Sequence, residues 1–119
     1  MSDVGGEDGS RPGLDLRALE AGNNVYATLR GPLRTAAVAE RFALAGWTCR
    51  SSSWHGYDVG TGWCQAELDP FEQGETLLNG IVVPAELGTL ASLLTEFGLS
   101  FTLELYDEEG VLLRELRSR

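Results

Sequence analysis

Two segments of the chain carry the same landmarks at a constant offset of 52 residues. Each begins a candidate helix at a proline and ends it fourteen residues later at a glycine, over Pro32–Gly46 and Pro84–Gly98. Each glycine is followed by strand-forming residues and then by a four-residue turn, His55–Asp58 and Asp107–Gly110. The offset predicts two copies of one strand-helix-strand-strand unit. It constrains the architecture and says nothing of an activity.

Both candidate helices have ordinary boundary residues and one apolar face. Proline is tolerated at the first helical position, and glycine is the usual residue just past a helix end. The second helix places apolar residues at spacings that fit a period of about 3.6 residues. The expected inward stripes, position for position, are Thr35, Val38, Phe42 and Ala45 in the first helix and Leu87, Leu90, Leu94 and Phe97 in the second.

The strand candidates complete a single α+β domain over residues 23–119. We expect tandem β-α-β-β units over residues 24–68 and 76–117, related by a pseudo-twofold axis. The natural packing is a mainly antiparallel sheet with both helices on one face, a ferredoxin-like or related fold. The other sheet face would then be open. Residues 1–22 are rich in Gly, Asp and Ser, and we expect a largely disordered acidic tail with a possible short helix at residues 14–20.

The charge distribution favours a protein partner over nucleic acid or membrane. The net charge is −9, and residues 69–119 hold ten acids against three arginines. Such a surface repels phosphate and anionic lipid but attracts a basic protein. All nine basic residues are arginine, which indicates a GC-rich genome. The chain shows no secretory signal and no apolar run near the roughly 18 residues that span a bilayer, so we expect a cytoplasmic protein.

The first hairpin is the most unusual stretch, because it contains all three tryptophans and both cysteines. A pairing of Trp54 with Val59 would set Cys49 opposite Cys64. Gly60 and Gly62 would then leave room for a tryptophan or a ligand. A slip of one residue would exchange the two faces. On the first register the open face presents three residue types that are common in binding hot spots: Arg50, Trp54 and Trp63.

No nucleophile, metal or phosphate motif stands out. A cysteine with His55 is a conceivable nucleophile pair, but the expected register separates them. The two cysteines are expected to be small buried hydrophobes. We predict no catalytic residue, no metal site and no cofactor, and an enzyme is the less favoured class. The candidate binding residues are Arg50, Trp54, His55, Tyr57, Trp63, Asp107, Glu108 and Glu109.

Tandem units of about fifty residues, together with the helix endings Phe42–Gly46 and Phe97–Gly98 and the closing segment Tyr106–Leu113, resemble the vicinal-oxygen-chelate (glyoxalase-like) superfamily. The resemblance implies one more strand in each unit. It also implies a divalent metal held by His, Glu or Gln on strands of both halves. No expected strand contains a histidine, so the family's metal site does not carry over to this chain.

Three functions remain open. The first is a non-enzymatic interaction domain, such as an immunity or inhibitor protein, that binds a basic partner. The second is a glyoxalase-like small-molecule binder or enzyme, with Gln65, Glu67, Glu104 and His55 as its polar groups. The third is a homodimer formed through the open sheet faces or the edge strand Val111–Leu116.

Overall fold

The computed structural model describes residues 23–52 and 55–118. It has an α+β fold with one seven-stranded antiparallel sheet and two α-helices, which confirms the expected fold class. The tail predicted over residues 1–22 lies outside the described residues. In sheet order the strands are β2 (Thr48–Ser51), β3 (Tyr57–Thr61), β4 (Cys64–Pro70), β5 (Thr76–Val82), β1 (Val25–Arg30), β6 (Ser100–Tyr106) and β7 (Leu112–Arg117).

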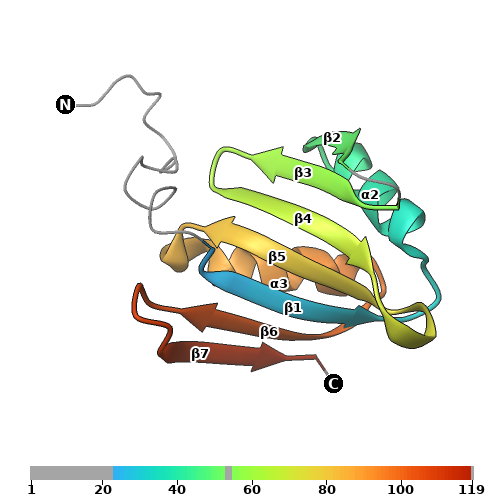
Figure 1. Ribbon diagram of the computed structural model, residues 1–119. Coiled ribbons are helices and arrows are strands. Elements are labelled where there is room, and N and C mark those ends of the chain that lie inside the picture. The colour runs from blue at the N-terminus through green and yellow to red at the C-terminus, as the bar shows by residue number, and fades with distance from the viewer. Residues whose placement is uncertain (1–22, 53–54, 119) are drawn as a thin grey trace.

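Both helices lie on the same side of the sheet (Figure 1). Helix α2 spans Thr35–Leu44 and helix α3 spans Leu87–Glu96, so both of their ends keep the 52-residue offset. Gly46 and Gly98 follow them with φ of 98° and 81°, the left-handed conformation expected of a glycine at a helix end. The helices begin later than predicted. Arg34 is still extended, and Pro84–Glu86 forms a 3-10 turn, η3; a second, η2, spans Glu72–Gly74.

The core lies between the helices and one face of the sheet. Leu87, Leu90 and Leu94 of α3 are fully buried, as their spacing predicted. In α2, the side chain of Thr35 is buried as predicted. Its hydroxyl is hydrogen-bonded to that of Thr76, with 2.8 Å between the oxygens, so the buried polar group has a partner. Ala45 is exposed, contrary to prediction, because α2 ends at Leu44. The strand side chains that complete this core are Val25, Ala27, Leu29, Val59, Cys64, Ala66, Leu68, Leu78, Val82, Phe101, Leu103 and Leu105.

The two helical crossovers differ although the helices are equally spaced in sequence. From β5 the chain passes through α3 to β6, and only β1 lies between these two strands. From β1 it passes through α2 to β2 at the far edge and returns through β3 to β4, beside β5. The offset maps Ser100, the start of β6, onto Thr48, the start of β2. The strand in the corresponding place of the sheet is β4.

The predicted register of the first hairpin is wrong. Cys49 is paired with Val59, and Val59 is paired with Ala66 on the next strand. The expected single strand over 59–68 is broken by a turn at Gly62-Trp63, so two hairpins replace one. The break turns the Trp63 ring inward, edge-on to Trp47 with 5.3 Å between ring centroids.

Gly80 is required by the close approach of β4 to β5. A Cβ atom on Gly80 would lie 2.1 Å from the carbonyl oxygen of Gln65 and 2.6 Å from the Cα of Ala66. Both obstacles are backbone atoms of the neighbouring strand, so side-chain movement cannot relieve the clash. We therefore expect Gly80→Ala to lower the free energy of unfolding by about 3 kcal/mol or more.

Gly88 provides the matched control, because a Cβ there would meet no atom within 4 Å. Gly88→Ala on α3 should raise the free energy of unfolding by up to about 1 kcal/mol, because alanine favours the helix. Urea unfolding followed by circular dichroism measures both variants. Equal midpoints for Gly80→Ala and the unmodified protein would contradict the steric argument.

Candidate functional site

A row of polar side chains crosses the sheet on the face opposite the helices. The strand registers pair these residues one after another, and directly paired residues share a face. Four members are carboxylates, called here the acidic row: Asp58, Glu67, Glu104 and Glu115. The complete row, from β2 to β7, is Arg50, Asp58, Glu67, Asn79, Tyr26, Glu104 and Glu115.

The acidic row contains two pairs of like charges. Asp58 lies directly opposite Glu67, and Glu104 lies directly opposite Glu115. Such cross-strand neighbours have Cβ atoms about 5 Å apart, and like charges at that distance destabilise the sheet. Taken by themselves, these two like-charge pairs therefore weaken the sheet rather than stabilise it. Between them lie Asn79 and Tyr26, which are uncharged.

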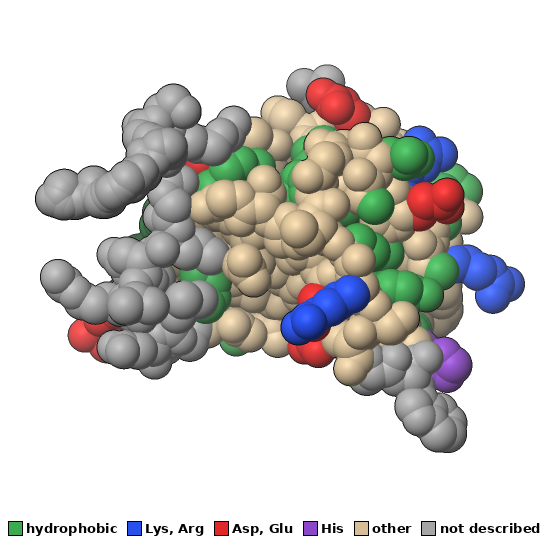
Figure 2. Space-filling model, turned by 90° about the horizontal axis from the view of Figure 1, so that it is seen from above, with side chains coloured by type: hydrophobic (Ala, Val, Ile, Leu, Met, Phe, Trp, Pro, Cys, Tyr) green, Lys and Arg blue, Asp and Glu red, His purple; other side chains and the backbone are tan. Residues whose placement is uncertain are grey.

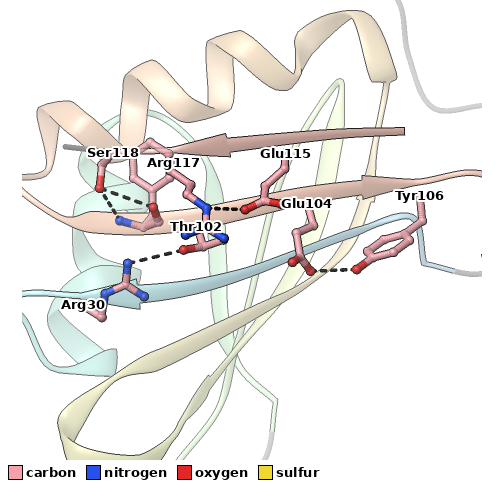
Figure 3. Close-up of polar contacts among 8 residues, drawn as sticks. Arg30, Thr102, Glu104, Tyr106, Glu115, Arg117 and Ser118 are labelled. Carbon is pink, nitrogen blue, oxygen red and sulfur yellow. Dashed lines mark hydrogen bonds and ion pairs between the residues drawn. The ribbon is translucent and has the colours of Figure 1, made fainter. Parts of the chain in front are cut away.

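Three of the four carboxylates have a local partner. Figure 3 shows two of these contacts: the Tyr106 hydroxyl donates a 2.8 Å hydrogen bond to Glu104, and Arg117 forms an ion pair with Glu115. Arg50 Nε lies 3.5 Å from Asp58 Oδ2. Glu67 has no hydrogen-bond or ion-pair partner among the residues that the structure describes. It is exposed and free to receive a donor from another molecule.

Two hollows lie on this face, one near each pair. The first, the Glu67 hollow, has a volume of about 530 Å³. It is lined by Arg50, Asp58, Gln65, Glu67 and Asn79 among others, and by the bare backbone of Gly60. Gly60 thus contributes room on the open face, one of the two uses predicted for it. Gly62 lies instead in the turn between β3 and β4.

The second, the tyrosine hollow, has a volume of about 520 Å³ and is lined by Asn23, Tyr26, Glu104, Tyr106, Asp107, Glu108 and Gly110. The Tyr26 and Tyr106 rings meet edge to face, with centroids 5.6 Å apart. The hydrogen bond to Glu104, assisted by the nearby Glu104 and Glu115 charges, raises the pKa of Tyr106. Both causes come from carboxylates of this face, which favour the neutral form of the phenol.

Arg50 and Trp63 do not form the expected exposed cluster. Trp63 is only 5% exposed and belongs to the core, so its predicted exposure is wrong. Arg50 is on the open face as expected, but it contacts Asp58 rather than an aromatic ring. Trp54 lies outside the described residues. Of the predicted hot-spot trio, the structure therefore places Arg50 on the open face and Trp63 in the core, and it does not test Trp54.

The three acids in the turn after β6 have different environments. Asp107 Oδ1 accepts hydrogen bonds from the backbone amides of Glu109 and Val111, at 2.8 and 2.9 Å, so this carboxylate holds the turn. Glu108 lines the tyrosine hollow, and Glu109 does not. Of the three predicted binding residues, Glu108 is the best placed to meet a ligand on the open face.

His55 and Tyr57 line a third hollow of about 640 Å³ at one end of the sheet. Its other walls are residues 31–36 and the loop that contains Phe71 and Gln73. The polar groups expected of a glyoxalase-like site are thus divided: Gln65 and Glu67 line one hollow, Glu104 a second and His55 a third. They do not converge on one ligand.

The described part of the chain contains neither a metal-binding cluster nor a membrane-spanning helix. Within residues 23–52 and 55–118, no group of three or more His, Cys, Asp or Glu side chains is placed to hold a metal ion. None of the described helices is long and apolar enough to cross a bilayer.

In the view of Figure 2, acidic and basic side chains are interspersed, without a broad patch of one sign.

Comparison with known proteins gives no relative. The chain matches no protein-family model, no curated protein and no solved structure. Its function must therefore be argued from its own geometry.

The two cysteines differ in environment and do not form a disulfide with each other. Cys64 is buried, as expected, and burial raises its pKa from 9.0 to about 12 because it disfavours the thiolate. Cys49 is exposed, contrary to prediction, because β2 is an edge strand. Neither lies beside His55 in a shared hollow.

We expect a thiol reagent at pH 8 to label Cys49 in the folded protein and Cys64 only after unfolding. Because the unfolded chain ionises Cys64 near pH 9 and the folded chain near 12, the stability that this thiol contributes is present below pH 9 and falls as the pH rises toward 12. Unfolding midpoints measured across this range for the unmodified protein and Cys64→Ala test the sign. Rapid labelling of both thiols in the folded state would contradict the burial.

Proposed function

We propose that this protein is a non-enzymatic interaction domain that binds a basic protein partner on the open face of its sheet, as immunity and inhibitor proteins do. The observation that carries the proposal is the acidic row, with its two like-charge pairs and the unpartnered Glu67. Carboxylates that destabilise the sheet become favourable contacts when an arginine or lysine of a partner lies between them.

We also infer that β1, α2, β4, β5, α3 and β6 form a ferredoxin-like unit derived from two tandem repeats. The order β4-β5-β1-β6 supports this. The α3 crossover joins the parallel strands β5 and β6 with β1 between them, and β1 and β4 are likewise parallel with β5 between them, although the chain passes through β2 and β3 before it reaches β4. The 52-residue offset of the helices supports the repeat. On this reading β2 and β3 are an inserted hairpin, and β7 is a strand added at the other edge.

The open face suits a protein better than a small molecule. Its two hollows are shallow depressions of a sheet surface, and their polar groups face outward over several strands. A small-molecule site usually encloses its ligand and is mostly apolar. A partner that spans both hollows would contact the row from β3 to β7, roughly 20 to 25 Å at the usual strand spacing.

Charge reversal on the row tests the proposal. Tagged protein is used to capture partners, at low and high salt, from a lysate of the cells that naturally express it. The double variant Glu67→Arg/Glu115→Arg should lose a stoichiometric basic partner that the unmodified protein retains at low salt. A loss of tenfold or more in affinity is expected if each contact contributes about 1 kcal/mol.

Two further variants carry the same change in net charge: a control on the helices, and a comparison at the acidic turn, where Glu108 lines the tyrosine hollow. Glu40→Arg/Glu96→Arg alters exposed positions on the helices, and Glu108→Arg/Glu109→Arg alters the acidic turn. The helix variant should keep the partner. Loss of the partner in all three variants would show that net charge alone steers binding, and retention in the row variant would overturn the proposal. Loss in the turn variant alone would move the site to the acidic turn.

A homodimer along β7 is a second candidate, favoured by three consecutive exposed apolar residues. Val111, Leu112 and Leu113 are 55%, 45% and 54% exposed beside an edge strand. The charged Arg114, Glu115 and Arg117 and the bulge near Leu113 are devices that usually protect an edge from pairing. Sedimentation over a range of concentrations decides, because a constant monomer mass excludes the dimer.

A further inference from the structure

The tyrosine hollow combines aromatic walls with an excess of negative charge. Tyr26 reaches it from β1 and Tyr106 from β6, and Tyr26 is 41% exposed although it is a large aromatic residue. Their edge-to-face arrangement leaves ring surface along the hollow. Of the residues that the structure describes, Glu104, Asp107 and Glu108 are the carboxylates that line it, and no described arginine does.

The carboxylates are held in different ways. The Tyr106 hydroxyl occupies Glu104 Oε1 and fixes that side chain, which leaves the second oxygen as an acceptor. Asp107 is engaged by the amides of its own turn. Glu108 stands exposed at the rim. A cation entering the hollow would therefore meet one oriented carboxylate, one adaptable carboxylate and two aromatic rings.

We propose that the tyrosine hollow binds a guanidinium group, an arginine side chain of the basic partner. This inference rests on the function proposed above. A guanidinium stacks on aromatic rings and donates paired hydrogen bonds to a carboxylate, so both kinds of wall are used. A quaternary ammonium would use the rings but leave Glu104 without a donor, and the ammonium of lysine stacks less well on a ring.

The Glu67 hollow does not have the same chemistry. Arg50 already lies in it beside Asp58, and none of the described residues that line it is aromatic. It can accept a hydrogen bond or an ion pair, but it cannot stack a planar cation. The two hollows therefore predict different side chains in the partner, with the arginine-specific contact on β1 and β6.

Titration of the full ¹⁵N-labelled chain with Nα-acetyl-arginine amide, followed by amide chemical shifts, tests the site. Saturable shifts are expected at Asn23, Tyr26 and residues 104–108. Nα-acetyl-lysine amide and tetramethylammonium chloride should bind more weakly, and sodium chloride of equal ionic strength should give no saturable change. Shifts no larger than those with sodium chloride would overturn the proposal, and tightest binding of tetramethylammonium would overturn the guanidinium assignment.

Matched variants identify the groups responsible. Glu104→Gln and Tyr106→Leu should each weaken arginine-amide binding about tenfold. The first removes the charge of the carboxylate acceptor and the second removes an aromatic ring, and a tenfold loss corresponds to about 1.4 kcal/mol. Glu109→Gln makes the same charge change as Glu104→Gln on a residue outside the hollow, and it should weaken binding less than twofold. The amide spectra also report whether each variant is folded. Equal weakening by Glu104→Gln and Glu109→Gln would reduce the effect to general electrostatics and overturn the site.

The outcomes separate this inference from the broader proposal. Glu67 and Glu115, which are reversed in the partner-capture test, do not line the tyrosine hollow. Loss of the partner in that row variant with no arginine-amide binding by the unmodified protein would reject the hollow and keep the interaction function. Arginine-amide binding with no effect of Tyr106→Leu on a captured partner would also reject the hollow as a partner contact.

Discussion

The antiparallel ladder between β1 and β5 is the constraint on which the rest of the structure depends. It joins Val25 to Gly80 and Leu29 to Thr76 at the middle of the sheet, and each of its strands leads into one of the two helices. Both crossovers return on the same side, so the two described helices cover one face of the sheet and neither covers the other. The ladder also positions Tyr26 beside Asn79 at the centre of the acidic row. The hydrophobic core and the candidate site therefore lie on opposite faces of this strand pair.

The helices could be predicted from the sequence because their signals are local. A period of 3.6 residues, a proline and a glycine all lie within one segment, and Leu87, Leu90 and Leu94 are buried as predicted. The hairpin register depends on which of several strand-like residues turns the chain. Gly62-Trp63 fits within the expected strand over 59–68, whereas the structure has a turn there and the Trp63 ring packs edge-on to that of Trp47. That contact depends on tertiary structure, and no local pattern contains it.

The acidic row could not be predicted for the same reason. Asp58, Glu67, Glu104 and Glu115 come from four strands, and only the registers make neighbours of them. The alternation of Thr102, Glu104 and Tyr106 with apolar residues does indicate one polar face, so the exposure of Glu104 on its strand could be predicted from the sequence. Three consecutive acids make the turn a candidate binding site, but the carboxylate of Asp107 accepts two backbone hydrogen bonds that hold the turn. Consecutive acids are easily recognised in a sequence, whereas acids that become neighbours only through strand pairing are not.

Like charges opposed across a sheet each cost a fraction of a kcal/mol, which the fully buried leucines on the opposite face can offset. The cost is present only while the row is unoccupied. A cation that binds between Glu104 and Glu115 would remove the repulsion and add an attraction, so it would stabilise the folded chain by linkage. Salt screens both terms, since the row is exposed and the Debye length is about 8 Å at physiological ionic strength. Added salt should therefore raise the stability of the free protein on this account while weakening its complex with a basic partner.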